Sequence, residues 1–242
     1  VLFLWHWLGG DATDFLERAE VQLAADTQQF IAVIPEKKGD VFFTWPVENF
    51  QGQARIDEEV GFFDDMLACV NEQYGADTSC VSSIGVSAGA LWTDQLAHRR
   101  STRLASFVSL SGGTGGVIKP WETAERRLPG LVLWGGDMDT CQGLLSFETL
   151  SNDLETHLTA DGHFFLECIH NCGHSEPPFE GPMGYSTYKG MWDFVLDHPY
   201  WVSPGASIYS DEGLSPDLPE WCAIGQGNAE ERTGECINPS QC

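Results

Sequence analysis

The strongest chemical signal in the sequence is a serine enclosed by small residues, in Gly85-Val86-Ser87-Ala88-Gly89. This segment matches the G-x-S-x-G pattern, in which the serine occupies a sharp turn and the glycines let a strand and a helix approach closely. An apolar run precedes the pattern and a helix-like run follows it, which is the context that it requires. We therefore predict that Ser87 is a nucleophile at the carboxyl end of a parallel sheet, where α/β proteins bind ligands.

A serine nucleophile needs a histidine base. The serine hydroxyl is weak at neutral pH, and the base is itself oriented by a carboxylate. In enzymes with this turn the order along the chain is serine, acid, histidine. Among the seven histidines, His170 and His174 come directly after the last predicted strand of the sheet. His174 follows a glycine in the loop "NCGHSEPP", whereas His170 falls at the strand end, so His174 is the predicted base.

Two aspartates compete for the role of the acid, in the segment "LVLWGGDMDTC". Asp137 and Asp139 both follow an apolar strand and a glycine pair. The usual spacing is a glycine, two residues and then the aspartate, which favours Asp139 when counted from Gly136. Asp137 is then interpreted as a turn-forming or solvated carboxylate.

Acyl transfer also requires backbone N–H groups aimed at the developing oxyanion. The first should belong to Ala88, immediately after the nucleophile, and the second to the loop after the first strand. That loop reads "HWLGG", and we assign the second donor to Leu8, with Trp7 as the alternative.

The rest of the pattern indicates an α/β fold with a mainly parallel sheet and helices on both faces, because apolar runs alternate with helical spacing. Strands are predicted at 1–5, 30–35, 80–86, 104–112, 130–136 and 163–169, and helices at 14–29, 56–70, 88–99, 144–158 and 188–195. The pattern ends near His198. We interpret residues 1–200 as one catalytic domain and 201–242 as an acidic, cysteine-containing extension packed on it.

Composition excludes several classes of function. The formal net charge of −24 repels phosphate backbones and anionic membranes, so a nucleic-acid partner is not expected. No apolar run approaches the roughly 20 residues that span a bilayer. The eight cysteines include no C-x-x-C pair, which favours disulfides in an oxidising compartment over a metal site. We therefore expect a secreted or periplasmic monomer with no metal and no organic cofactor.

Several segments in this order resemble one family: "HWLGGDATDF", "TWPVENF" with "RIDEEVGFF", "YGADTSCVSSIGVSAGA", "GGDMDT" and "CIHNCGHSEPP". Together they look like the secreted polyhydroxybutyrate depolymerase and feruloyl-esterase type of α/β-hydrolase. The resemblance implies a serine carboxylesterase without a cofactor, acting on hydroxyalkanoate or hydroxycinnamate esters. It places the nucleophile, acid and base on Ser87, Asp139 and His174.

The chain departs from that family in three places. Trp7 stands where a glycine is expected, Ala90 stands where a second glycine often follows the nucleophile, and the leading strands of the family are missing. The family resemblance also places the aromatic loop with Trp45 beside the cleft. Trp7 and Trp45 are therefore the predicted substrate contacts.

The cysteine positions suggest two bridges. Cys69 and Cys80 flank a predicted helix-to-strand turn. Cys141 and Cys172 each lie two residues from a predicted catalytic residue, so a bridge between them would tie the acid and base loops together, with Cys168 as an alternative partner for Cys141.

The prediction is thus a serine esterase acting through a Ser-His-Asp triad and an acyl-enzyme. A serine peptidase of the same fold and a non-catalytic hydrolase-like binding module are the alternatives.

Overall fold

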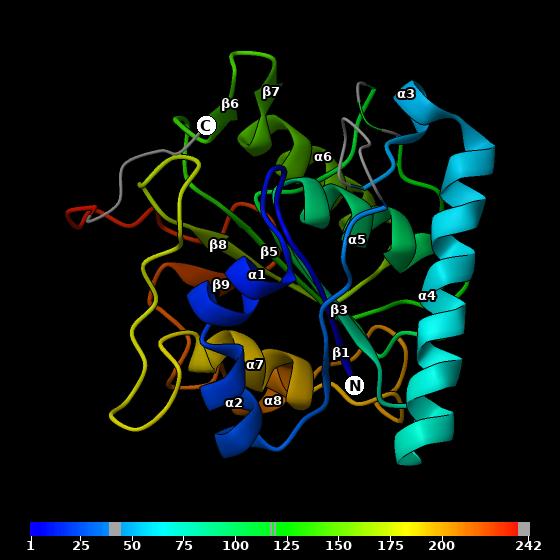
Figure 1. Ribbon diagram of the computed structural model, residues 1–242. Helices are drawn as coiled ribbons and strands as arrows, with labels where there is room; N and C mark the ends of the chain where they lie inside the picture. The colour runs from blue at the N-terminus through cyan, green and yellow to red at the C-terminus, as the bar shows by residue number, and fades with distance from the viewer. Residues whose placement is uncertain (39–44, 117, 119, 237–242) are drawn as a thin grey trace.

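A seven-stranded, mostly parallel sheet forms the centre of the molecule (Figure 1). The computed structural model describes residues 1–38, 45–116, 118 and 120–236. The sheet order is β2-β1-β3-β4-β5-β8-β9, and every neighbouring pair is parallel except β8 and β9. The strands are β1 (Leu2–Trp5), β2 (Ala32–Val33), β3 (Ser82–Val86), β4 (Ser106–Leu110), β5 (Gly130–Trp134), β8 (Phe165–Ile169) and β9 (Cys222–Ile224).

Helices cover both faces of this sheet, because the central strands are apolar on both sides. In β1, Leu2 and Leu4 belong to one buried cluster, while Phe3 and Trp5 belong to the other, as the two-residue period of a strand requires. The first face packs against α1 (Ala12–Arg18), α2 (Val21–Gln28), α7 (Lys189–Leu196) and α8 (Tyr209–Glu212). The second packs against α4 (Gln53–Tyr74), α5 (Ala88–Arg99) and α6 (Phe147–Asp161). The short α3 (Glu48–Gln51) precedes α4.

Three predicted elements differ in the structure. The helix expected over 14–29 is two helices, since Glu20 adopts a left-handed conformation with φ 52° between α1 and α2. The strand expected over 30–35 pairs only through Ala32 and Val33. Leu144 lies outside α6, in a small hairpin of β6 (Thr140–Cys141) and β7 (Leu145–Ser146), and α6 begins where the Ser146 hydroxyl accepts the Thr149 N–H.

The C-terminal segment extends the sheet. β9 pairs antiparallel to β8, with Cys168 opposite Cys222, and these two residues form a disulfide. Further along, Cys236 forms a disulfide with Cys172. The segment predicted as an extension therefore contributes an edge strand and two disulfide cysteines to the domain.

Both predicted disulfide pairings are wrong. Cys69 and Cys80 carry free thiols. Cys172 is bonded to Cys236 and Cys168 to Cys222, so neither is the partner of Cys141, which takes part in a different disulfide. The prediction failed because it considered only the closeness of the acid and base loops, whereas the C-terminal segment also lies beside the base loop.

Within the described residues, no helix is long and apolar enough to cross a membrane. The same residues contain no group of three or more histidine, cysteine or acidic side chains that could hold a metal ion.

A buried carboxyl pair joins α6 to the C-terminal segment. Glu155 is fully buried beside Glu167, whose carboxylate accepts the N–H groups of Gly227 and Ala229, each at 2.8 Å. Burial and the negative charge of Glu167 raise the pKa of Glu155 from 4.5 to about 9. The folded protein therefore keeps a proton that the unfolded chain releases, so its stability decreases as pH rises from about 4.5 to about 9.

We expect Glu155→Gln to stabilise the fold at neutral and alkaline pH. The amide cannot ionise. At pH 7 the folded protein must keep Glu155 protonated, which lowers the free energy of unfolding by about 3 kcal/mol, and the substitution removes this loss. Urea unfolding at pH 5 and pH 8 should show a larger gain at pH 8. Glu148→Gln, an exposed change in the first turn of the same helix, is the control. An equal gain at both pH values would contradict this account of Glu155.

Candidate active site

Ser87 occupies a strained turn between β3 and α5. Its backbone has φ 55° and ψ −117°, in a region that non-glycine residues rarely adopt. A Cβ at Gly85 would lie 2.1 Å from the Gly89 carbonyl oxygen, and one at Gly89 would lie 2.0 Å from the carbonyl oxygen of Trp5. Both glycines are therefore sterically required, and the turn presents the Ser87 side chain at the carboxyl end of the sheet.

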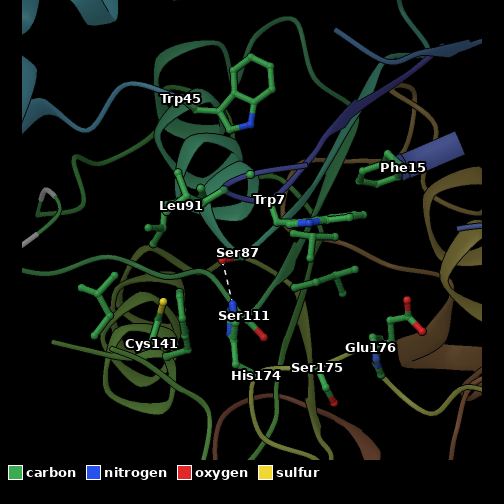
Figure 2. Close-up of a pocket in the computed structure, with 18 of the residues that line it drawn as sticks. Trp7, Phe15, Trp45, Ser87, Leu91, Ser111, Cys141, His174, Ser175 and Glu176 are labelled. Carbon is green, nitrogen blue, oxygen red and sulfur yellow. Dashed lines mark hydrogen bonds between the residues drawn. The ribbon is translucent and has the colours of Figure 1, made fainter. Parts of the chain in front are cut away.

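His174 lies within hydrogen-bonding distance of this serine. The Ser87 hydroxyl donates to Nε2 of His174 at 2.9 Å (Figure 2). The imidazole also stacks on Phe147, with 4.5 Å between ring centroids and 13° between planes. The loop that carries His174 contacts the acid loop, since Gly173 N–H donates to the Gly135 carbonyl at 2.9 Å.

Asp139 completes the arrangement from the loop after β5. Nδ1–H of His174 donates to Oδ1 of Asp139 at 2.7 Å, which fixes the tautomer that leaves Nε2 free to accept the serine proton. Oδ2 of Asp139 accepts the Ser111 hydroxyl at 2.7 Å and the Gly135 N–H at 2.8 Å. The Asp139 carboxylate is completely buried and contacts His174, whereas Asp137 is exposed.

Sequence reasoning did not identify Ser111, which supports the acid from the end of β4. Ser111 has φ 52°, and the turn beyond it is fixed by Asp94 from α5. Oδ2 of the buried Asp94 accepts the Ser109 hydroxyl at 2.8 Å and the Gly113 N–H at 2.6 Å. Burial raises the pKa of Asp94 to about 7. The available signal was positional, because Ser111 directly follows β4 at the same sheet edge as Ser87.

The loop after β1 is oriented by a buried histidine. His6 Nδ1–H donates to the Trp7 carbonyl at 3.0 Å, and Gly10 N–H donates to the same oxygen at 3.1 Å. Burial lowers the pKa of His6, which keeps the ring neutral. In a trans peptide the N–H of the next residue points away from the carbonyl. The Leu8 N–H therefore points away from His6 and Gly10, which donate to the Trp7 carbonyl. Leu8 and Ala88 both border the cavity described next.

A cavity of about 960 Å³ opens at Ser87 and His174. Figure 2 shows Leu91 and Cys141 on one side of Ser87, and Trp7, Phe15 and Glu176 on the other. The first side is mostly aliphatic, because Val47, Leu91, Ile118 and Leu145 pack there with Phe147. The second side is aromatic and charged, with Trp7, Phe15, Arg18, Glu176 and Tyr188.

The two tryptophans predicted to contact substrate, Trp7 and Trp45, differ in how far they are exposed in the cavity. Trp7 is partly exposed, stacks on Phe15 at 6.2 Å and lies under the Arg18 guanidinium, which is paired with Glu176. Trp45 borders the cavity but is only 1% exposed, and its indole N–H donates to the His6 carbonyl at 2.6 Å. The structure therefore gives Trp45 a supporting position, and its contact with substrate stays a prediction.

His170, the alternative base, points elsewhere. It is fully buried, its Nδ1 accepts the Cys172 N–H at 3.1 Å, and burial lowers its pKa to about 4. No described residue partners its Nε2. His170 is thus a neutral support of the base loop, not a competitor for Ser87.

Comparisons with solved structures identify the fold. A native pOPH structure superposes with a TM-score of 0.73 at 16% identity, over 93% of this chain and 85% of the other. A Bacillus cereus carboxylesterase matches with a TM-score of 0.56 at 19% identity, covering 81% and 87% of the two chains. A phospholipase/carboxylesterase from Dyadobacter fermentans gives 0.56 at 15%, covering 81% and 89%.

No family model and no curated protein matches the sequence. At these identities the structural likeness establishes the fold alone, and the chain has the α/β-hydrolase fold. The closer relation to depolymerases and feruloyl esterases stays a prediction.

Proposed function

We propose that this protein is a serine hydrolase of carboxylic esters. The observation that carries the proposal is the continuous line of hydrogen bonds from Ser87 through His174 to the buried Asp139. The nucleophile, the base and the orienting acid are in the relation that acyl transfer requires. The carboxylesterases among the structural neighbours support the same class of reaction.

The first half of the reaction forms an acyl-enzyme. His174 Nε2 takes the hydroxyl proton as Ser87 Oγ bonds to the ester carbonyl carbon. The oxyanion of the tetrahedral intermediate accepts hydrogen bonds from the N–H groups of Ala88 and Leu8. The intermediate collapses with cleavage of the carbon–alkoxide bond, and His174 returns the proton to the leaving alcohol.

Water then releases the acyl group. His174 takes a proton from water, the hydroxide adds to the acyl carbon, and the second intermediate expels Ser87, which recovers its proton. Asp139 stays ionised throughout and stabilises the imidazolium in both halves.

The two-sided cavity indicates substrates with an apolar group on each side of the ester. An ester with aliphatic carbons in the Leu91 side and an aryl or short chain beside Trp7 and Phe15 fits this lining. The charge of −24 disfavours polyanionic substrates. Polyhydroxyalkanoates, aromatic polyesters and hydroxycinnamate esters are the candidate classes.

The disulfides support action outside the reducing cytosol. Cys168–Cys222 and Cys172–Cys236 fit an oxidising compartment, and we propose that the protein works as a secreted or periplasmic monomer.

A hydrolysis panel tests this proposal. It contains nitrophenyl esters from acetate to octanoate, methyl ferulate, films of polyhydroxybutyrate and an aromatic polyester, and a nitroanilide, each with Ser87→Ala as the control. We expect hydrolysis of esters and none of the amide. Amide cleavage at a comparable rate would favour a peptidase instead.

Filling the aliphatic side should change acyl-chain preference. Leu145→Trp is expected to reduce kcat/KM for the octanoate ester by about 10–200-fold, the range set by lost hydrophobic contacts, while the acetate ester is little affected. Leu23→Trp, an exposed change on α2 outside the cavity lining, is the matched control. Equal losses for acetate and octanoate would show that Leu145 does not bound the acyl site.

A further inference from the structure

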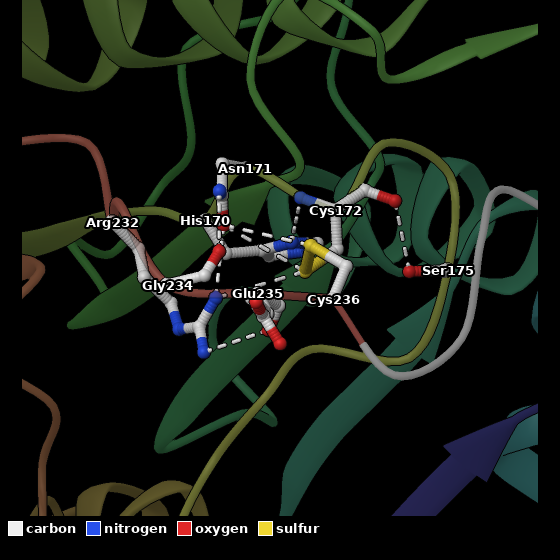
Figure 3. The surroundings of a disulfide bond; sticks show 8 residues. All are labelled: His170, Asn171, Cys172, Ser175, Arg232, Gly234, Glu235 and Cys236. Carbon is white, nitrogen blue, oxygen red and sulfur yellow. Dashed lines mark hydrogen bonds between the residues drawn. A yellow bond between two sulfur atoms is a disulfide. The ribbon is translucent and has the colours of Figure 1, made fainter.

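The loop that carries His174 is held from outside the sheet by a C-terminal strap, residues 231–236. Cys172, two residues before His174, forms a disulfide with Cys236 at the end of the strap (Figure 3). The beginning of the strap follows β8, because Arg232 N–H donates to the Ile169 carbonyl at 3.0 Å. The strap is thus attached to the last residue of β8 near its beginning and to the base loop at its end.

Between these two attachments, side-chain hydrogen bonds also join the strap to the base loop. The Arg232 guanidinium donates to Asn171 Oδ1 at 3.0 Å and to the Glu235 carbonyl at 3.2 Å. Asn171 Nδ2 donates back to the Gly234 carbonyl at 2.8 Å, and Figure 3 shows this ring of contacts around the disulfide. Asn171 is therefore bound through both atoms of its amide.

The strap also lies against the acid loop. A Cβ added at Gly136, in the turn before Asp139, would lie 2.6 Å from Oε1 of Glu231 and 3.2 Å from the His170 carbonyl oxygen. The two loops that bring His174 and Asp139 together are thus packed against the same strap.

The base loop has little regular structure of its own. It follows the end of β8, and its internal bonds run from Cys172 N–H to His170, from Ser175 N–H to the Gly173 carbonyl, and from the Ser175 hydroxyl to the Cys172 carbonyl. Few internal bonds hold such a loop in one conformation, and a misplacement of about 1 Å in a catalytic group can cost about 10²-fold in rate.

We propose that the strap positions His174, with Cys172–Cys236, Asn171 and Arg232 as its positioning residues. This inference rests on the proposed function, since it assigns these residues to the placement of the catalytic base. It predicts that loss of the strap lowers kcat and leaves KM for a short ester nearly unchanged, because the substrate cavity is not lined by the strap.

The chain offers a matched control. Cys168–Cys222 also ties the C-terminal segment to β8 and closes a loop of 54 residues, against 64 for Cys172–Cys236, so both bonds constrain the unfolded chain similarly. The experiment compares C172A/C236A with C168A/C222A in kcat, KM, melting temperature and amide hydrogen exchange of the peptide that contains His174.

We expect both pairs to lower the melting temperature. C172A/C236A should reduce kcat for nitrophenyl acetate by about 10–100-fold and speed exchange around His174, whereas C168A/C222A should keep kcat near that of the wild type. Equal kcat for the two folded pairs, or unchanged exchange around His174 in C172A/C236A, would overturn the proposal.

The milder variants Asn171→Ala and Arg232→Ala keep the test decisive if a double variant does not fold. They should lower kcat in the same direction with KM unchanged, and retention of full kcat in both would overturn the proposal. An inactive wild type with an exchange pattern that still depends on the strap would instead refute the esterase function and leave the structural role of the strap intact.

Discussion

Replacing Ser87 by alanine is expected to reduce ester hydrolysis by on the order of 10⁵–10⁶-fold, because the acyl-enzyme can no longer form. The backbone at Ser87 has the same strain with either side chain, and both neighbouring glycines remain. The variant should therefore fold and bind substrate as the wild type does. Single-turnover and steady-state rates with a nitrophenyl ester measure the loss directly.

Ser109→Ala is the comparison for this prediction. Ser109 also lies near the carboxyl end of a central strand, β4, but its hydroxyl donates to Asp94 and not to His174. We expect this change to cost stability and to spare most of the activity. Comparable losses in Ser87→Ala and Ser109→Ala would mean that the serine hydroxyl at position 87 is not the nucleophile.

The second large effect concerns the acid. Asp139→Asn is expected to lower kcat by about 10⁴-fold, because the amide no longer selects the His174 tautomer whose Nε2 accepts the serine proton. Asp137→Asn should leave kcat nearly unchanged, since Asp137 is exposed while Asp139 bonds to His174. The two substitutions are chemically identical and two residues apart, so general charge effects cancel in the comparison.

A reversed result, with Asp137→Asn inactive and Asp139→Asn active, would show that Asp137 and not Asp139 is the acid of the triad. Ser111→Ala should give a smaller loss than Asp139→Asn, because Asp139 Oδ2 retains its bond from Gly135 N–H. The series therefore separates the acid from the residue that supports it.

The sequence predicted the elements whose residues follow a local period. The helix after Ser87 and the five longer strands agree with the structure closely, because apolar runs and the steric demand of Gly85 and Gly89 are local properties. The prediction of Ser87, Asp139 and His174 as a triad rests on the same logic, since each lies after a strand at one edge of a parallel sheet.

The remaining features depend on contacts between distant segments. β9 has only three residues and acquires its strand pairing from β8. The partner of Cys172 is 64 residues away, and no local spacing distinguishes Cys236 from the other cysteines. His6 and Ser111 gain their supporting roles only when two loops meet at the sheet edge, so their residue types carried no signal alone.

The most direct test is covalent labelling with a fluorophosphonate, followed by mass spectrometry of the peptides. The proposed mechanism predicts one phosphonyl group on Ser87, strongly slowed labelling in Asp139→Asn, and no labelling in Ser87→Ala. An unlabelled wild-type protein that still hydrolyses esters, or labelling at another serine, would contradict the central claim.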